Sequence, residues 1–254
     1  MNNLSAYSLD GHTALVTGGG TGIGRAVTQC LVAAGARVII TGRRADVLQE
    51  TAAEFGPAVI PHVMDVTATA EIAPAVKQLT ATHGPITILV NNAGIHIKKP
   101  FVETTEEEIL RVFQTHVMGA LALSRALEPG MRTAGGGSIV FMSSMAALFG
   151  IPKVSAYTVA KSALTGAVRA LAVELGEANI RVNAVAPGWI ETEMSRKALD
   201  GDPARKAKIL GRTPLGRLGD PSDIGWAVAY LCSPAARFVT GTVVPVDGGA
   251  SMGF

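Results

Sequence analysis

The sequence has few of the features that mark metalloproteins, secreted disulfide scaffolds or membrane proteins. Its 254 residues include only two cysteines, Cys30 and Cys232, and neither belongs to a Cys/His cluster with metal-ligand spacing. We therefore expect neither a disulfide framework nor a bound metal. No run of about 18 apolar residues is free of charge and glycine, so we also expect no membrane span.

Charge of either sign is sparse and balanced. Lys and Arg total 22 against 20 for Asp and Glu, and no basic stretch or acidic tail stands out. A nucleic-acid partner is therefore not expected. The segment 1–20 lacks a basic region followed by an apolar one, so it does not look like a secretion signal. These absences favour a soluble, reduced, cytoplasmic protein without nucleic-acid or membrane partners.

Short β-branched segments alternate with longer amphipathic ones, in a composition that is 48% hydrophobic. The expected strands span 12–17, 36–41, 58–64, 86–90, 138–143, 180–186 and 242–248. The expected helices span 22–35, 45–55, 67–83, 104–132 and 154–177. Because the strands are apolar on both faces, helices must cover both sides of the sheet. The pattern predicts an α/β fold, a doubly wound parallel sheet flanked by helices on both faces, in a single domain over 1–254.

The least regular segment is 188–215, which is polar and able to form helix. It follows the carboxyl end of an expected strand. In open α/β sheets, ligands bind beyond the carboxyl ends of the strands. We therefore expect this segment to cover a bound substrate.

A glycine-rich turn, "TGGGTGIG" at 17–24, joins the first expected strand to the first expected helix. Gly18, Gly22 and Gly24 let the backbone turn sharply and approach a pyrophosphate, which the free N–H groups of the helix N-terminus then bind. The same glycines can also serve only a tight strand–helix turn. The position on the first strand of a β-α series favours nucleotide binding.

The end of the second strand indicates which dinucleotide fits. Sites selective for NAD usually carry an acid about 20 residues past the glycines, to bind the ribose 2′-OH. Here Gly42 holds that position, and Arg43 and Arg44 follow. A guanidinium can hold a 2′-phosphate with two hydrogen bonds, so we predict NADP, with NAD still possible. The arginines can also simply begin a solvated helix.

Two further strand ends carry polar side chains. Asp65, in "MDV", can accept from the adenine amino group or cap the helix that starts near Thr67, and the two uses are compatible. "VNNAGI" at 90–95 offers amide hydrogen bonds beside the cofactor, although such a sequence can also form only a turn.

In "SAYTVAKSAL", Tyr157 and Lys161 are four residues apart and lie on one face of a helix. The Lys161 ammonium can then stabilise the phenolate, so we expect a lowered tyrosine pKa and proton exchange with substrate near neutral pH. A serine at the end of the preceding strand would hold the same oxygen. Taken alone, such a pair more often belongs to an ordinary helix surface.

The motifs occur together as "TALVTGGGTGIG", "LVNNAG", "SS…Y…K", "RVNAVAPGWIETEM" and "VDGG", across nearly the whole chain. In this order and spacing the sequence resembles the short-chain dehydrogenase/reductase family of the compact, single-domain type. The resemblance implies a Rossmann sheet, a homotetramer and an NAD(P)-dependent oxidoreductase acting on a small carbonyl or secondary alcohol. A competing interpretation is a cofactor-binding redox sensor or regulator without turnover.

The resemblance also implies roles for single residues. Tyr157 is the general acid/base, and Lys161 binds the nicotinamide ribose and tunes the tyrosine. The family's serine lies 13 residues before the tyrosine, which selects Ser144 over Ser143. Around the cofactor, in order from pyrophosphate through adenosine to nicotinamide, the implied residues are Gly18, Thr21, Gly22, Ile23, Gly24, Arg43, Asp65, Val66, Asn92, Ala93, Gly94, Tyr157, Lys161, Pro187, Gly188, Ile190 and Thr192.

The sequence departs from the family at two positions. His116 stands where relatives usually have an asparagine that supports a water linking the lysine to solvent. His116 can relay protons itself, since histidine titrates near neutrality, or it can be a packed histidine with no step of its own. Thr21 stands where NADP-preferring relatives often have Arg or Lys, which weakens the cofactor prediction.

The substrate is less clearly indicated. His96, Lys98 and Lys99 can contact an acidic or polyol substrate, or form a solvated loop. "NNAGIHIKKPF" resembles sugar-acid members of the family, although 3-oxoacyl thioesters and hydroxysteroids also fit. The apolar C-terminal stretch 237–254 can form a subunit interface or pack within one chain. Residues that can line the pocket or pack in the core are Met145, Phe149, Trp189 and Met194.

Overall fold

Short aliphatic runs form one seven-stranded sheet in the order β3-β2-β1-β4-β5-β6-β7, with every neighbouring pair parallel. The computed structural model describes residues 3–199 and 201–252. The strands are β1 (Thr13–Thr17), β2 (Arg37–Gly42), β3 (Val59–Val63), β4 (Ile88–Asn91), β5 (Gly137–Met142), β6 (Ile180–Pro187) and β7 (Val243–Val246). All seven expected strands are confirmed, with ends shifted by up to a few residues.

The strand order reverses beside β1, which pairs with β2 on one side and with β4 on the other. Val16 of β1 lies opposite Ile40 in one pairing and opposite Val90 in the other. The connections after β1 and β4 therefore leave toward opposite faces and open a crevice at the carboxyl ends of these strands. Such a switch point is where ligands bind in doubly wound sheets.

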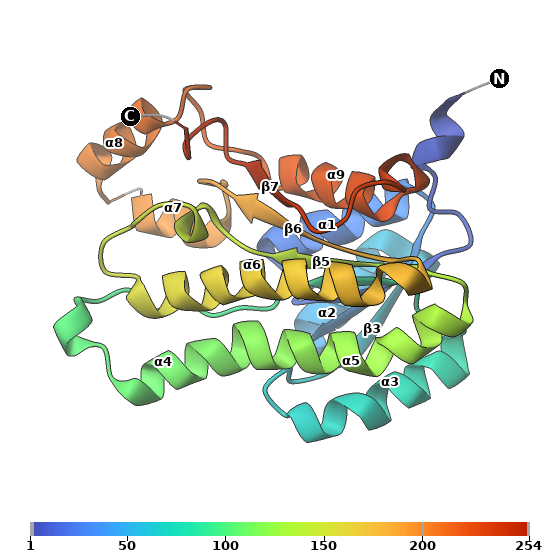
Figure 1. The fold of residues 1–254 in the computed structure, drawn as a ribbon. Helices are drawn as coiled ribbons and strands as arrows, with labels where there is room; N and C mark the ends of the chain where they lie inside the picture. The colour runs from blue at the N-terminus through green and yellow to red at the C-terminus, as the bar shows by residue number, and fades with distance from the viewer. Residues whose placement is uncertain (1–2, 200, 253–254) are drawn as a thin grey trace.

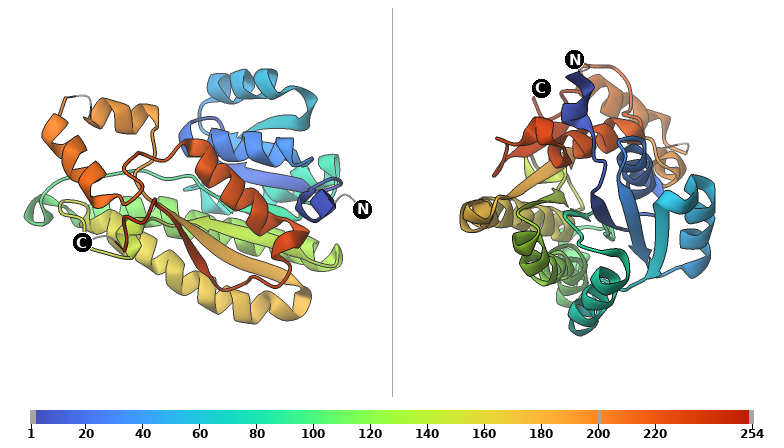
Figure 2. Two further views of the ribbon diagram at one scale, coloured as in Figure 1. Left: turned by 90° about the horizontal axis from the view of Figure 1, so that it is seen from above. Right: turned by 90° about the vertical axis from the view of Figure 1, so that its right-hand side faces the viewer.

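Helices cover both faces of the sheet, as its strands require (Figure 2). One face packs α1 (Gly22–Ala33), α2 (Ala45–Phe55) and α9 (Pro221–Cys232) over a core that includes Val27 and Ile224. The other packs α3 (Thr69–His83), α4 (Glu106–Phe113), α5 (Gly119–Thr133) and α6 (Ser155–Leu175) over a second core. The fold class is therefore confirmed. No helix in the described part of the chain is long and apolar enough to span a bilayer.

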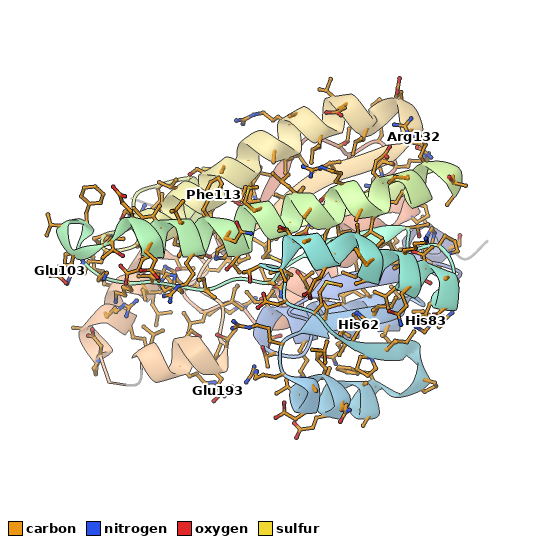
Figure 3. All side chains as sticks on the ribbon, turned by 90° about the horizontal axis from the view of Figure 1, so that it is seen from below. His62, His83, Glu103, Phe113, Arg132 and Glu193 are labelled. Carbon is orange, nitrogen blue, oxygen red and sulfur yellow. The ribbon has the colours of Figure 1, made fainter. Side chains whose placement is uncertain are left out.

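The helix expected over 104–132 is one long rod with an irregular centre (Figure 1). In Figure 3, Phe113 marks the end of α4 and Arg132 the last turn of α5. Between the two helices, residues 114–118 form a π-helical turn, η4 (Gln114–Met118). The 3₁₀ turns are η1 (Asn3–Tyr7), η2 (Gly56–Ala58), η3 (Phe101–Glu103), η5 (Met145–Ala147), η6 (Gly176–Ala178) and η7 (Pro234–Ala236).

The segment 188–215 contains two helices, α7 (Glu193–Leu199) and α8 (Pro203–Arg212). Both lie at the end of the molecule toward which the β6 arrow points in Figure 1. Helix α9 was not expected from the sequence. Its signal is a capping box in which the Asp220 side chain accepts from backbone N–H groups of the first turn, followed by Pro221 at the first helical position.

Candidate active site

The glycine turn wraps the start of α1 tightly against the end of β1. Gly18 and Gly22 have φ of +65° and +52°, which side chains disfavour, and a Cβ at Gly24 would overlap the Gly18 carbonyl oxygen. Thr21 makes no side-chain cap, and the first turn of α1 holds no acid. The N–H groups of Gly22, Ile23 and Gly24 are thus left for an anion.

A group of hydrogen bonds connects the end of β4 to this turn. The Thr17 hydroxyl oxygen accepts from the backbone N–H groups of Asn92 and Ala93, each at 2.9 Å. The Asn92 amide donates to the carbonyl oxygens of Thr17 (2.9 Å) and Gly18 (3.3 Å). In this structure, Asn92 therefore holds the crevice together. Thr17 was not predicted as a site residue, because its only signal in the sequence is a hydroxyl side chain at a strand end.

A cavity of about 230 Å³ runs along the carboxyl ends of these strands. Its lining includes seven of the residues predicted to bind cofactor: Gly18, Thr21, Arg43, Asp65, Val66, Ala93 and Gly94. The lining combines the backbone of the glycine turn, at a helix N-terminus, with the side chains of Arg43 and Arg44. A dinucleotide with anionic phosphates fits this donor set.

Asp65 lies in the turn after β3. Its Oδ1 accepts from the Thr67 N–H (2.9 Å) and hydroxyl (2.8 Å), and these bonds, with the nearby Arg43 charge, lower the Asp65 pKa. The carboxylate is therefore ionised and shapes the turn ahead of α3. Its position in the cavity lining also leaves it beside the place predicted for adenine.

The three predicted catalytic side chains meet at the carboxyl end of β5. The Lys161 ammonium donates to the Met142 carbonyl oxygen (2.5 Å) and lies 5.4 Å from the centroid of the Tyr157 ring. The two serines after β5 differ in their partners. The Ser143 hydroxyl donates to the Lys161 carbonyl oxygen (3.3 Å), whereas the Ser144 hydroxyl faces the phenol of Tyr157 and lowers its pKa.

The pKa of Tyr157 shifts in the direction opposite to the one predicted from the sequence. Burial raises the pKa of Tyr157, and the hydrogen bond from Ser144 only partly offsets it. Burial also lowers the pKa of Lys161 to about 7. The expected lowering of the tyrosine pKa was wrong for the protein alone, because the desolvation cost of a phenolate outweighs the stabilisation available from its neighbours.

The residues predicted around nicotinamide follow β6 and approach the glycine turn. A Cβ built on Gly22 would lie 3.7 Å from the Thr192 methyl group, in ordinary contact. The Thr192 hydroxyl accepts from the Ser195 N–H (3.2 Å), which starts α7. Pro187 ends β6, Gly188 donates to Val246 (3.0 Å), and Ile190 bridges to Gly219. Through Thr192, this segment therefore lies beside the start of α1.

Of the side chains predicted for the substrate pocket, some contact Tyr157 or an arginine, and others are buried in the protein. His96 meets the Tyr157 ring edge-on, with 4.9 Å between centroids. Phe149 and Trp189 lie under Arg212 (4.0 Å) and Arg205 (5.8 Å), cation contacts that the sequence did not indicate. Met145 is buried, and the Met194 side chain is outside the described part of the structure. Within that part, no three His, Cys, Asp or Glu side chains group as metal ligands.

Comparison with known proteins decides the family. A family model described as enoyl-(acyl carrier protein) reductase matches residues 18–251. The chain belongs to the short-chain dehydrogenase/reductase family. Its membership makes the protein an NAD(P)-dependent oxidoreductase, and the interpretation as a regulator without turnover is not favoured.

Two relatives with different names resemble this short-chain dehydrogenase/reductase over almost its whole length. It is 38% identical over 253 residues to a tropinone reductase homologue from Arabidopsis thaliana, covering 98% of this chain and 96% of the relative. It is also 38% identical over 251 residues to galactitol 2-dehydrogenase (L-tagatose-forming) from Cereibacter sphaeroides, covering 98% of each.

Two solved structures superimpose on almost the entire short-chain dehydrogenase/reductase fold. Gluconate 5-dehydrogenase from Burkholderia cenocepacia, in complex with NADP and tartrate, has a TM-score of 0.94 at 30% identity, over 100% of both chains. A 7α-hydroxysteroid dehydrogenase complexed with NADH and 7-oxo glycochenodeoxycholic acid has a TM-score of 0.93 at 35% identity, over 98% of each.

His116, the departure from the short-chain dehydrogenase/reductase pattern, is buried within the π-helical turn. Its Nε2 lies 3.1 Å from the Ile95 nitrogen and 2.8 Å from the Ile95 carbonyl oxygen, and its ring is 5.4 Å from that of Tyr157. Burial first, and the nearby Lys161 charge second, lower the His116 pKa to about 3. The geometry favours a packed, neutral histidine that holds the loop after β4.

We expect His116→Asn to leave the pH profile of turnover unchanged. A ring with a pKa of about 3 takes up no proton near neutrality, so its removal deletes no titrating group from that range. The measurement is kcat against pH for both proteins, with thermal unfolding to record any stability loss. Disappearance of one limb of the profile in the variant would show that His116 relays protons.

Proposed function

We propose that the protein is an NADP-preferring enzyme that interconverts a carbonyl and a secondary alcohol on a sugar acid or polyol. The observation that carries the proposal is the meeting of Ser144, Tyr157 and Lys161 at the carboxyl end of β5, beside the dinucleotide crevice. The galactitol 2-dehydrogenase and gluconate 5-dehydrogenase relatives support the substrate class. The segment with α7 and α8 covers the substrate in this proposal.

The bound nicotinamide supplies the hydride chemistry, and the chain's own residues manage the proton. The Tyr157 hydroxyl gives its proton to the substrate oxygen in reduction and takes it back in oxidation. Ser144 faces the same hydroxyl and orients it. Lys161, anchored on Met142, holds its positive charge beside the ring and favours the phenolate when it forms.

The experiment that tests the function follows NADPH oxidation with a panel of carbonyl compounds, run in parallel with a direct measurement of cofactor binding. Turnover of one or more carbonyls supports the enzyme. Cofactor binding without turnover of any carbonyl or alcohol would instead favour the redox sensor or regulator.

The preference for NADP depends on Gly42 and Arg43 at the end of β2. A Cβ at Gly42 would meet Leu48 at 3.6 Å, an ordinary contact, so the position has room for a side chain. We expect Gly42→Asp to raise the KM for NADPH about tenfold or more, because a carboxylate repels the 2′-phosphate, while the KM for NADH changes little. We expect Arg43→Ala to act in the same direction.

Gly42→Ala is the matched control, since it adds the carbon without the charge. Steady-state kinetics with both cofactors make the comparison. Preference of the unaltered enzyme for NADH, or an unchanged KM for NADPH in Arg43→Ala, would refute the NADP assignment. The 7α-hydroxysteroid dehydrogenase solved with NADH keeps NAD as the other possible cofactor.

The proposal includes a homotetramer in the cytoplasm. Apolar side chains are exposed around α9 and the C-terminal stretch, and a second set lies along α4 and α6. Exposed apolar side chains gathered on neighbouring elements often mark subunit contacts. These side chains are Leu110, Val159, Val173, Trp226, Tyr230, Phe238 and Met252. Both cysteines are buried and free, which supports a reducing compartment.

A further inference from the structure

The loop after β4 carries basic side chains close to Tyr157. The His96 ring contacts the Tyr157 ring edge-on, and Lys98 follows two residues later on the same loop. The Lys99 N–H donates to the Lys153 carbonyl oxygen (2.9 Å), which fastens the loop to the segment leading into α6. Lys98 is exposed on this fastened loop, and its charge acts on His96, which contacts the tyrosine.

Helix α8 brings another cation to the same region. The Arg205 guanidinium lies over the Trp189 ring, 5.8 Å from its centroid, and buried Ile209 anchors the next turn of α8 to the protein. The Arg205 backbone N–H donates to the Asp202 carboxylate (2.9 Å), which caps the helix. Arg205 is thus held in place by an aromatic platform.

The charges on the two segments act on one another. Beyond the effect of burial, Arg205 and Lys153 lower the pKa of Lys98, while Asp202 opposes them. Burial lowers the pKa of His96, and the charges of Lys98 and Arg205 lower it further. Among the residues that the structure describes, no carboxylate forms an ion pair with Lys98 or Arg205. A bound anion would relieve this repulsion.

We propose that Lys98 and Arg205 form a subsite for a carboxylate of the substrate, set back from the carbon that reacts at Tyr157. The inference rests on the proposed function, which makes Tyr157 the reacting group. Lysine supplies a point charge and arginine a planar fork of donors, a combination suited to a carboxylate. The substrate class is therefore a hydroxy or oxo acid of sugar size, in preference to the neutral polyol.

Calorimetric titration of the NADPH-saturated protein with gluconate and with glucitol tests this subsite. The two probes differ only in a carboxylate against a hydroxymethyl group, and reduced cofactor prevents either alcohol from being oxidised. We expect gluconate to bind about tenfold more tightly than glucitol. Lys98→Gln and Arg205→Gln should each remove most of that difference without changing the affinity for glucitol. Added salt should weaken only gluconate binding.

Lys99→Gln and Lys208→Gln are the matched controls, one on the same loop and one on α8. Lys99 already pairs with Glu108 at 2.6 Å, so its loss should leave gluconate affinity unchanged. Equal affinity for the two probes, no measurable gluconate binding, or a gluconate preference that survives both variants would overturn the subsite. Failure to reduce any carbonyl in the NADPH assay is a separate result that would overturn the proposed function.

Discussion

Tyr157→Phe should lower kcat about 10³-fold while NADPH still binds. The substitution removes only the hydroxyl that exchanges the proton. The ring that remains keeps its edge contacts with His96 and His116, at 4.9 Å and 5.4 Å, so the fold around the site is expected to stay intact. Single-turnover kinetics and NADPH binding, measured on the same preparation, separate the loss of chemistry from a loss of affinity.

The chain provides its own controls, because it has only two other tyrosines. Tyr7 and Tyr230 are partly exposed and lie together, 6.4 Å between ring centroids, away from the crevice. Their change to phenylalanine should leave kcat unaltered. A Tyr157→Phe enzyme that retained a tenth or more of its turnover would exclude the phenol as the general acid/base.

Lys161→Met should stabilise the protein near neutral pH while it reduces kcat/KM about 10²-fold. Lys161 is buried, and its pKa of about 7 in the folded protein is well below the usual value. The folded state therefore bears the cost of a buried charge below neutrality. Methionine has a similar length without the charge, and relief of that cost is worth about 1–4 kcal/mol.

The pH dependence gives a sharper test of the lysine. Between its folded pKa of about 7 and its unfolded value near 10.4, the unfolded chain binds more protons at this residue than the folded protein. Lys161 should therefore contribute a rise in the free energy of unfolding with pH across this range, and Lys161→Met should remove that contribution. Denaturant titrations from about pH 6 to 10 measure it. Lys77→Met, at an exposed position on α3, is the control.

Local sequence rules predicted the sheet and the positions of the main site residues. The glycine turn had to follow the first strand, and the four-residue spacing placed Tyr157 and Lys161 on one helix face. Both features depend only on backbone geometry over a few residues, so they can be predicted from the local sequence. The choice of Ser144 depended on family spacing, and the structure adds that Ser143 instead bonds the Lys161 carbonyl oxygen.

Other properties depend on tertiary packing and could not be obtained from spacing. The raised pKa of Tyr157 results from burial by distant segments. The contact between Arg205 and Trp189 joins α8 to the end of β6, across a segment that looked irregular in sequence. The π-helical turn is similar: nothing in "QTHVM" marks it, and it is recognised only by its backbone hydrogen bonds.

The packing of His116 against the loop after β4 limits how this chain can change in evolution. The Gly94 α-carbon faces the imidazole so closely that any Cβ there would overlap the ring. Replacement of the glycine is thus tolerated only after the histidine has been exchanged for something smaller. The order of mutational steps at these two positions is therefore constrained, and their effects on fitness should be strongly epistatic.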